Sequence, residues 1–393
     1  MGLTDISGST SHRRRRLTAA ALVALGALAA FAVDRAAADQ PPNVIVIAGD
    51  DHTWPFYGFM GDPIVQTPNF DRLADSGAVF PVAHSSATVC RPSLESLLYG
   101  VYPKDKRPPR PGPRRYDAIG HYLQQAGYAT YLFGKIWNSP GEYGFLESDQ
   151  FWWIRPTNVN AALAWIDGRP PTQPWAMWWG TRLPHKGFKA PAHFQQLYAS
   201  LPIDPTLKLY YANISWLDDL IGQLLDGLES RGLRQNTLII YVNDNGFWFD
   251  AKYSRREDGF RTPIIVSYPA AIPPGQRFDG ANLRMAHALD ILPTILDYAG
   301  LPRPAHLAGT SLRGLVEGTQ VEPWREYLFD HQGRFRFVRT QDGFRYWKLG
   351  THRRALYDLN NDPREEIDLS ADPAHQARIA TLDAVLNAWW NPQ

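Results

Sequence analysis

Residues 43–51 read Asn-Val-Ile-Val-Ile-Ala-Gly-Asp-Asp, and this stretch decides which fold the chain can adopt. The run from Asn43 to Ala48 is apolar and β-branched, which is typical of a strand buried on both faces of a parallel sheet. Asp50 and Asp51 follow directly at the carboxyl end of that strand. Adjacent carboxylates repel each other unless a cation neutralises them, and hard oxygen ligands favour Ca²⁺ or Mg²⁺ over zinc. An ordinary acidic loop is the alternative.

Polar side chains follow three further strand-like runs in the same way. The runs cover residues 129–133, 175–179 and 237–242, and the polar residues behind them are Lys135, His185, Asp244 and Asn245. Open α/β sheets bind ligands at the carboxyl ends of their strands. We therefore expect these side chains to meet the two aspartates in one site, although a loop histidine is often simply exposed to solvent.

A long helix is predicted between the last two of these runs. Apolar residues recur there at intervals of three and four: Tyr210, Ile214, Leu217, Ile221, Leu224 and Leu228. This spacing gives one apolar stripe, as on an amphipathic helix that packs against a sheet. Strands that alternate with helices indicate an α/β fold.

Cys90 is the only cysteine among 393 residues. It lies at or just before a predicted helix that runs from Ser93 to Tyr99. Pro92 suits a first helical position, and Gly100 suits a C-terminal stop. A helix start favours a bound anion and lowers a thiol pKa, and a free thiol in an exported chain is explained by a modification of the cysteine. A buried structural cysteine is the alternative.

The segment Cys90-Arg91-Pro92-Ser93, followed by an apolar helix that ends in Leu-x-Gly, resembles the signature of the type I sulfatases. In that family the cysteine is oxidised after synthesis to formylglycine, whose hydrated aldehyde is the nucleophile. The resemblance therefore implies that a formylglycine-generating enzyme is a partner during maturation. The usual signature continues with arginine, whereas Leu94 stands at that position here.

The order of the motifs is similar to that family as well. The segment Thr67-Pro68-Asn69-Phe70-Asp71 heads a helix between the first strand and Cys90, and Leu356-Tyr357-Asp358-Leu359 resembles the closing segment of the family. The similarity runs from about residue 42 to the C-terminus. It implies an alkaline phosphatase-like α/β/α sandwich with a large mixed, mostly parallel sheet and a small C-terminal antiparallel subdomain.

The resemblance also implies roles for the site residues. Four oxygen ligands are implied for Ca²⁺, with Mg²⁺ as an alternative: Asp50, Asp51, Asp244 and Asn245. A catalytic set of four residues is implied beside them: Cys90, Lys135, His185 and Lys252. The two lysines would hold sulfate oxygens, and the histidine would protonate the leaving alcohol.

One residue of the family pattern is missing. A histidine that helps to release sulfate normally follows the Gly-Lys segment by two or three residues, and here Trp137 and Asn138 stand at those positions. Water or His52 is the substitute that we expect.

Two loops near the predicted site leave alternatives open. Lys252 lies in a short loop, so Arg255 or Arg256 is an alternative ligand for sulfate. Residues 139–174 are rich in aromatic residues and prolines, and we predict that they form an insertion over the active site. The tryptophans of this segment include Trp152, Trp153 and Trp165.

The C-terminal part of the chain changes pattern. Residues 335–340 and 344–349 alternate around an Asp342-Gly343 turn, which predicts a β-hairpin. A last helix after Pro373 has an apolar face made by Ile379, Leu382, Leu386 and Trp389. We predict three parts: a signal peptide at 1–38, a catalytic domain at 39–330 and a C-terminal subdomain at 331–393.

The N-terminus has the order of a signal peptide. Arg13–Arg16 precede an apolar run from Leu17 to Val33, and the small residues Ala36–Ala38 follow it. We expect export by a Sec or twin-arginine signal to the periplasm or the medium, with no stable membrane anchor after cleavage. An uncleaved N-terminal anchor is the alternative.

Composition narrows the class of function. The chain has 44% hydrophobic and 20% charged residues and a formal net charge of +1, so it is an ordinary globular protein with no charge excess that would suggest nucleic acid. The function that we expect is hydrolysis of sulfate esters of a carbohydrate or an aryl group. Two alternatives remain: a phosphate or phosphonate ester hydrolase on the same scaffold, and a degenerate sulfatase-like protein that binds sulfated glycans without cleaving them.

Overall fold

The computed structural model describes residues 41–105, 116–149, 158–320 and 323–390 of the chain. The predicted signal peptide, Trp152 and Trp153 lie outside the described residues. Within those four ranges, no helix combines the length and the apolar character needed to cross a membrane.

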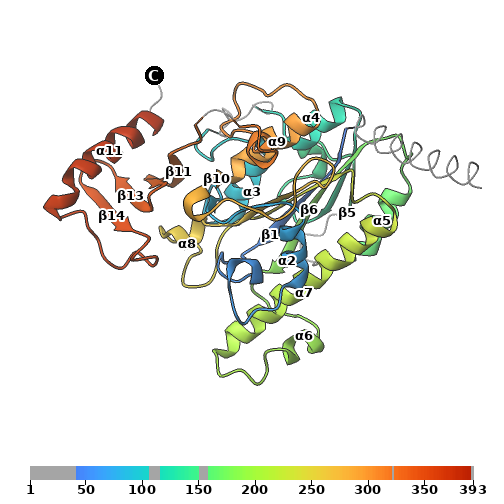
Figure 1. Cartoon of the computed structure of the whole chain (residues 1–393), viewed down its shortest axis with the longest axis horizontal. Coiled ribbons are helices and arrows are strands. Elements are labelled where there is room, and N and C mark those ends of the chain that lie inside the picture. Colours follow the sequence, from blue (N-terminus) through green and yellow to red (C-terminus); the bar gives the residue numbers. More distant parts are fainter. Residues whose placement is uncertain (1–40, 106–115, 150–157, 321–322, 391–393) are drawn as a thin grey trace, which may run out of the picture. The chain divides into compact units, whose positions relative to one another are not determined.

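A mixed sheet forms the centre of the fold (Figure 1). Its strands, in chain order, are β1 (Asn43–Asp50), β2 (Ala78–Phe80), β4 (Ala129–Gly134), β5 (Glu147–Asp149), β6 (Trp175–Pro184), β7 (Thr237–Asn243), β8 (Ile264–Ser267) and β9 (Gln276–Arg277). The spatial order is β5-β4-β6-β1-β7-β8-β2-β9. Only β8 runs antiparallel to its described neighbours, which are β7 and β2. The predicted mixed, mostly parallel sheet is therefore confirmed.

Strand β1 lies in the middle of this sheet, between β6 and β7. Val44 and Val46 pack into the hydrophobic core on one face, and Ile45 and Ile47 pack into the core on the other face. Successive side chains of a strand point to opposite faces, so an uninterrupted apolar run is what a strand buried on both sides requires.

Helices cover both faces of the sheet, as Figure 1 shows. One face is covered by α2 (Pro68–Asp75), α5 (Val159–Asp167) and α7 (Pro205–Ser230). The other face is covered by α3 (Cys90–Tyr99), α4 (Ile119–Gln125) and α9 (Ile291–Tyr298). The predicted amphipathic helix is confirmed as α7, and it begins earlier than its apolar stripe because the Asp204 side chain accepts hydrogen bonds from two backbone N–H groups of its first turn.

Short elements connect these layers. Three short helices are α6 (Ala192–Gln196), α8 (Glu257–Phe260) and α10 (Arg313–Val316). The 3₁₀ turns are η1 (Gly58–Met60), η2 (Pro140–Tyr143), η3 (Gly280–Asn282), η4 (Ala288–Asp290) and η5 (Pro373–His375). A parallel pair of two-residue strands, β3 (Ala83–His84) and β10 (Ala286–His287), precedes α3 and α9 in the chain.

A separate antiparallel sheet follows in the C-terminal part. Its strands are β11 (Tyr327–Gln332), β12 (Phe335–Thr340), β13 (Phe344–Leu349) and β14 (Arg353–Asp358), and α11 (Gln376–Trp390) packs on them. The predicted hairpin is confirmed as β12 and β13. Ile379, Leu382 and Leu386 of α11 are buried, which confirms the apolar face expected for the last helix.

Buried ion pairs join this second sheet to the loops of the first. Asp330 of β11 lies 2.6 Å from His84 Nδ1, and Arg339 of β12 lies 2.6 Å from Glu257 at the start of α8. His84 Nε2 is in turn 3.3 Å from Glu257. None of these four side chains is more than 6% exposed. The C-terminal sheet is therefore fastened by charge as well as by apolar contacts.

The aromatic segment 139–174 does not form the predicted cover where it is described. Its described residues form η2, β5 and α5, and Trp165 of α5 stacks on Tyr131 with a centroid distance of 4.7 Å. Trp165 is half-buried and packs against the core between the sheet and α7. The prediction was wrong for this residue because composition alone does not separate a packed tryptophan from one that lines a cleft.

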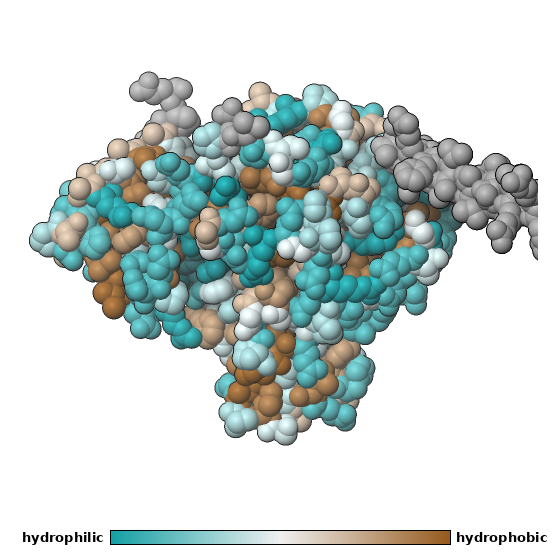
Figure 2. All heavy atoms as spheres, viewed as in Figure 1, coloured by the Kyte–Doolittle hydropathy of each residue, from teal (hydrophilic) through white to brown (hydrophobic). Residues whose placement is uncertain are grey.

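Apolar side chains also gather on the surface at α6 and the first turns of α7, on the projection at the bottom of Figure 2. Leu197 and Leu209 are 42% and 38% exposed there.

Candidate active site

Cys90 starts α3, directly behind Val89, which takes an extended backbone conformation as the N-cap. The helix ends at Gly100, whose left-handed backbone (φ 67°) suits glycine, as the sequence predicted. The Cys90 side chain is buried, and its Sγ lies 3.5 Å from Asp50 Oδ1 and 4.0 Å from Asp51 Oδ1. The thiol therefore faces the carboxyl end of β1.

The acidic residues come from two neighbouring parallel strands. Asp50 ends β1 and Asp51 follows it, while Asp244 and Asn245 follow β7. The Asp51 backbone N–H donates to Asp244 Oδ1 at 3.0 Å, and the Asn245 side-chain amide donates to Asp51 Oδ1 at 2.7 Å. Because β1 and β7 run in parallel, their polar ends meet at one edge of the sheet.

Two lysines balance part of this negative charge. Lys135, behind β4, places its Nζ 2.7 Å from Asp50 Oδ1 and 3.5 Å from Asp244 Oδ2. Lys252 places its Nζ 2.7 Å from Asp51 Oδ1 and 3.3 Å from the Cys90 sulfur. An anion bound next to the sulfur would therefore lie near two ammonium groups.

The sequence left Arg255 and Arg256 open as alternatives to Lys252. Arg255 instead lies over the ring of Phe335 in the C-terminal sheet, with its guanidinium carbon 4.6 Å from the ring centroid. Lys252 is the residue of this loop that reaches both Asp51 and Cys90.

His185 follows β6 and completes the set of residues predicted from the sequence. Its Nε2 lies 3.5 Å from Asp51 Oδ2, and its Nδ1–H donates to the Lys186 carbonyl oxygen at 3.1 Å. The side chain is 28% exposed, so it lies at the mouth of the cluster. Burial lowers the pKa of His185. The structure thus brings all eight predicted residues together around the Cys90 sulfur.

Burial and like charge dominate the electrostatics of the cluster. Burial and the neighbouring Asp50 raise the pKa of Asp51 to about 6 and that of Asp244 to about 7. Burial and the carboxylates of Asp244 and Asp50 also raise the pKa of the Cys90 thiol. The prediction of a thiol pKa lowered by the helix start was wrong, because desolvation and three nearby carboxylates outweigh that effect.

The residues present fit a divalent cation. Asp50 Oδ2, Asp244 Oδ2 and Asn245 Oδ1 are buried and accept no hydrogen bond. Ligand atoms of Asp50, Asp51, Cys90 and His185 also lie within 4.8 Å of one another. Buried oxygen atoms that accept no hydrogen bond are costly, and oxygen-rich donor sets are what Ca²⁺ and Mg²⁺ prefer.

His52 does not take the place of the missing family histidine. The ring is fully buried and stacks on Tyr57 at 3.7 Å, and its Nε2 lies 2.8 Å from the Phe56 carbonyl oxygen. Burial lowers the pKa of His52 to about 3, so the ring is a neutral packing element. Trp137 stands instead beside Lys135, whose Nζ lies 5.7 Å from the indole centroid.

One loop near the cluster was missed by the sequence analysis. A cavity of about 500 Å³ beside Lys252 is lined by Phe247, Trp248, Phe249, Asp250, Lys252 and Tyr253. Three consecutive aromatic residues directly behind Asn245-Gly246 are the signal that could have identified it.

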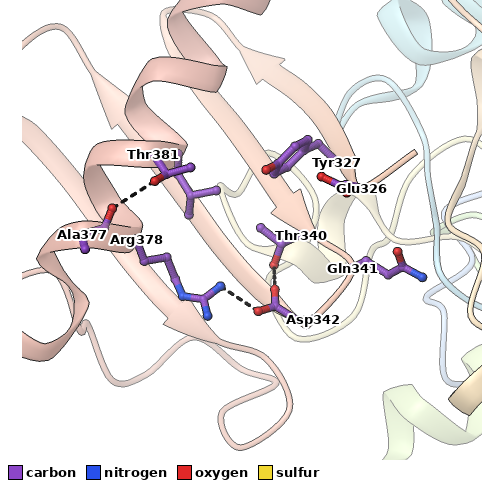
Figure 3. A pocket seen from close by; sticks show the side chains of 9 residues that line it. Glu326, Tyr327, Thr340, Gln341, Asp342, Ala377, Arg378 and Thr381 are labelled. Carbon is purple, nitrogen blue, oxygen red and sulfur yellow. Dashed lines mark hydrogen bonds and ion pairs between the residues drawn. The ribbon is translucent and has the colours of Figure 1, made fainter. Parts of the chain in front are cut away.

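A second cavity of about 500 Å³ lies in the C-terminal sheet, between β12 and α11 (Figure 3). Its wall includes Tyr327, Thr340 and Arg378, and Arg378 donates to Asp342 at 2.7 Å. It shares no residue with the Cys90 cluster, so no site chemistry is assigned to it.

Comparison with known proteins agrees with this geometry. The family model described as Sulfatase matches residues 42–301, and the model described as N-sulphoglucosamine sulphohydrolase, C-terminal, matches residues 245–391. An N-acetylglucosamine-6-O-sulfatase of Bacteroides thetaiotaomicron is 24% identical and covers 82% of each chain. An N-acetylgalactosamine-6-sulfatase of Rattus norvegicus is 26% identical, over 76% of this chain and 68% of that protein.

Solved structures are similar over nearly the whole chain. One is described as a complex with its substrate D-glucosamine-2-N,6-O-disulfate; it has a TM-score of 0.74, 21% identity and coverage of 88% of this chain and 97% of that one. A phosphonate monoester hydrolase of Agrobacterium radiobacter has a TM-score of 0.73, 20% identity and coverage of 88% and 95%. These likenesses show the alkaline phosphatase-like fold. With the family match over most of its length, the chain belongs to the sulfatase family of sulfuric ester hydrolases.

Proposed function

We propose that this protein hydrolyses a sulfate ester of a carbohydrate, with a formylglycine derived from Cys90 and a divalent cation held by four oxygen ligands. The ligands are Asp50, Asp51, Asp244 and Asn245. The relatives named above are sulfatases of amino sugars, which supports a sulfated carbohydrate as the substrate class. Ca²⁺ is the proposed cation.

One observation carries this proposal. Carboxylates, Lys135 and His185 from the ends of separate strands gather at a single buried sulfur, from which Asp50 Oδ1 lies 3.5 Å away. Lys252, from the loop after β7, places its Nζ 3.3 Å from the same sulfur. A structural cysteine needs none of these charges, and three carboxylates next to an inert thiol would only destabilise the fold.

The residues of the chain divide the work as follows. When present, formylglycine supplies a geminal hydroxyl as nucleophile, and the cation lowers the pKa of that hydroxyl and offsets charge on the sulfate oxygens. Lys135 and Lys252 hold the transferring group between two ammonium charges in a partly dry site. His185 carries the proton to the oxygen of the leaving alcohol, since its Nε2 faces the cluster at the open mouth.

Maturation and location belong to the same proposal. A formylglycine-generating enzyme would convert Cys90 before the chain is active. The basic, apolar and small-residue order at 1–38 supports export to the periplasm or the medium through a cleaved signal peptide.

The likeness to a phosphonate monoester hydrolase supports a second candidate, a phosphate or phosphonate ester hydrolase. Purified protein from the native host, assayed with nitrophenyl sulfate, nitrophenyl phosphate and a phosphonate monoester, separates the two. We expect sulfate esters to be cleaved with the highest kcat/KM and a Cys90→Ala protein to be inactive. Preference for the phosphonate would replace the proposal, and tight binding of a sulfated sugar without release of sulfate would leave a binding protein.

A further inference from the structure

The aromatic cavity adjoins the Cys90 cluster through a shared residue. Lys252 lines the cavity, and the same ammonium group contacts Asp51 and the Cys90 sulfur. A molecule whose ester group is bound between the two lysines therefore has this cavity, of about 500 Å³, as its direct neighbour.

The loop that forms the wall is attached to the segments that carry the cluster. The backbone N–H groups of Phe247 and Trp248 donate to Thr53 Oγ1 at 3.1 and 2.8 Å, just behind β1. The Tyr253 N–H donates to the Thr88 carbonyl oxygen at 3.1 Å, just before α3. These bonds hold the aromatic wall in register with both the carboxylates and residue 90.

Three residues of the loop adopt the left-handed backbone conformation that favours glycine. Phe249, Asp250 and Tyr253 have φ angles of 59°, 56° and 63°. Such strain persists only where surrounding contacts impose it, and it is common at ligand sites. Tyr253 is 72% exposed, so packing of its ring does not explain its left-handed backbone conformation.

The cavity lies on the side of the cluster where the leaving alcohol would receive its proton. His185 stands at the mouth of the cluster, and Phe188 of the same loop packs against Phe247 with a centroid distance of 6.4 Å. The oxygen that receives a proton from His185 therefore departs toward the wall formed by residues 247–253.

The chemistry of the wall favours a sugar ring. Trp248 is backed by Tyr210 at 5.6 Å and Phe249 by Phe56 at 5.7 Å, so both rings are held firmly. The C–H faces of a pyranose pack on aromatic faces, and its hydroxyl groups can donate to the exposed Asp250 carboxylate. The Asp250 carboxylate would repel a second sulfate group on the same sugar, and the aryl group of an aryl sulfate has no hydroxyl to donate a hydrogen bond to it.

We propose that residues 247–253 form the subsite for the sugar ring that bears the ester, and that the preferred ligands are pyranose monosulfates with free hydroxyl groups. This inference rests on the proposed function of the Cys90 cluster. Tyr253 and Asp250 are the specificity-determining residues: the tyrosine supplies an aromatic face, and the aspartate accepts a hydroxyl hydrogen bond.

Binding measurements test the subsite without turnover. Full-length Cys90→Ser protein, loaded with Ca²⁺, is titrated calorimetrically with glucosamine 6-sulfate, galactosamine 6-sulfate, galactose 6-sulfate and inorganic sulfate. We expect the best pyranose sulfate to bind about tenfold more tightly than inorganic sulfate, because only the sugar reaches the wall. Adding Tyr253→Ala or Asp250→Ala should remove most of that advantage and leave the Kd of inorganic sulfate within about twofold.

A matched control is offered by the cavity of Figure 3, which has the same volume and also an aromatic wall residue. Tyr327→Ala should leave every Kd unchanged. Equal Kd values for sugar and inorganic sulfate, or unchanged sugar binding in both subsite variants, would overturn the inference. The inference would also be overturned if the two subsite variants bound inorganic sulfate as weakly, relative to the parent protein, as they bind the sugar sulfate. The two proposals can also fail separately. If the sugar binds tightly and its binding depends on Tyr253, but protein from the native host with residue 90 unsubstituted releases no sulfate, the proposed hydrolysis is refuted and the sugar subsite is supported.

Discussion

At the scale of single residues, Lys252 contacts both the carboxylates of the site and the sulfur of Cys90. Its ammonium group contacts a carboxylate at 2.7 Å and the Cys90 sulfur at 3.3 Å. A charge in this position is already in place before a sulfate ester arrives, so its interaction with the transition state requires little reorganisation.

Replacing Lys252 with alanine is expected to lower kcat/KM for a sulfate ester by about 100- to 1,000-fold, the usual effect of removing one preorganised donor. Steady-state release of inorganic sulfate measures the change. Arg255→Ala is the matched control, because this cation belongs to the same loop but lies over the Phe335 ring. An equal loss in the two variants would contradict the role of Lys252.

His185→Gln should distinguish proton donation from binding. A sugar alkoxide is a poor leaving group and needs the proton, whereas a nitrophenolate leaves without it. We expect kcat/KM to fall about 100-fold for a sugar sulfate and less than about tenfold for nitrophenyl sulfate. Equal losses with the two substrates would argue that His185 positions the ester instead.

At the scale of elements, buried ion pairs join the loops of the first sheet to strands β11 and β12 of the C-terminal sheet. Although burial opposes both shifts, Arg339 and His84 hold the pKa of Glu257 well below its usual range, and His84 lowers the pKa of Asp330 to about 2. Glu257 and Asp330 in turn raise the pKa of His84 against the effect of burial. The carboxylates stabilise the fold above their unfolded pKa values and lose this effect as the pH falls, while the contribution of His84 is full below about pH 6.5 and is lost as the pH rises through its raised pKa.

Glu257→Gln is therefore expected to lower the free energy of unfolding by about 3–5 kcal/mol near pH 6, because it removes the buried carboxylate that pairs with Arg339 and one of the two carboxylates that flank His84. The difference from wild type should shrink as the pH falls below about 4.5 and through the lowered pKa of Glu257 in the folded protein. Urea unfolding over a pH series measures it. Glu147→Gln, in an exposed pair with Arg169, should cost less than about 1 kcal/mol at every pH. A pH-independent difference for Glu257→Gln would contradict the account.

At the scale of elements, the sequence predicted the strands well because their patterns are local. An apolar run such as 43–48 indicates both its strand conformation and its burial, and the rule that ligands gather at strand ends then predicted one site for six residues. Cys90 and Lys252 were assigned to that site through the family resemblance. The network around Glu257 was out of reach, since its partners come from distant segments. The wall at 247–253 and the packing of Trp165 against the core were missed for a related reason, because an aromatic side chain reads alike in a core and in a cleft.

The activity and the thermal stability of the whole molecule should depend on the divalent cation that the acidic cluster fits. Exhaustive chelation is expected to abolish sulfate release and to lower Tm, because three buried carboxylates are then balanced by the lysines alone. Ca²⁺ at about 100 times its Kd should restore activity and about 2.7 kcal/mol of stability. Thermal unfolding with and without Ca²⁺ measures the effect, and Asp244→Asn should weaken the response. Equal Tm values for the chelated and the Ca²⁺-loaded wild-type protein would contradict the site.

Cys90 is proposed to be the precursor of the nucleophile. The most direct test is the mass of the proteolytic peptide that contains residue 90, from protein purified out of its native host. We predict a peptide lighter than the encoded one by the difference between a thiol-bearing methylene and an aldehyde, despite the leucine at position 94. A peptide with an unmodified thiol in native protein would contradict the formylglycine mechanism and leave the cluster as a binding site or a different hydrolase.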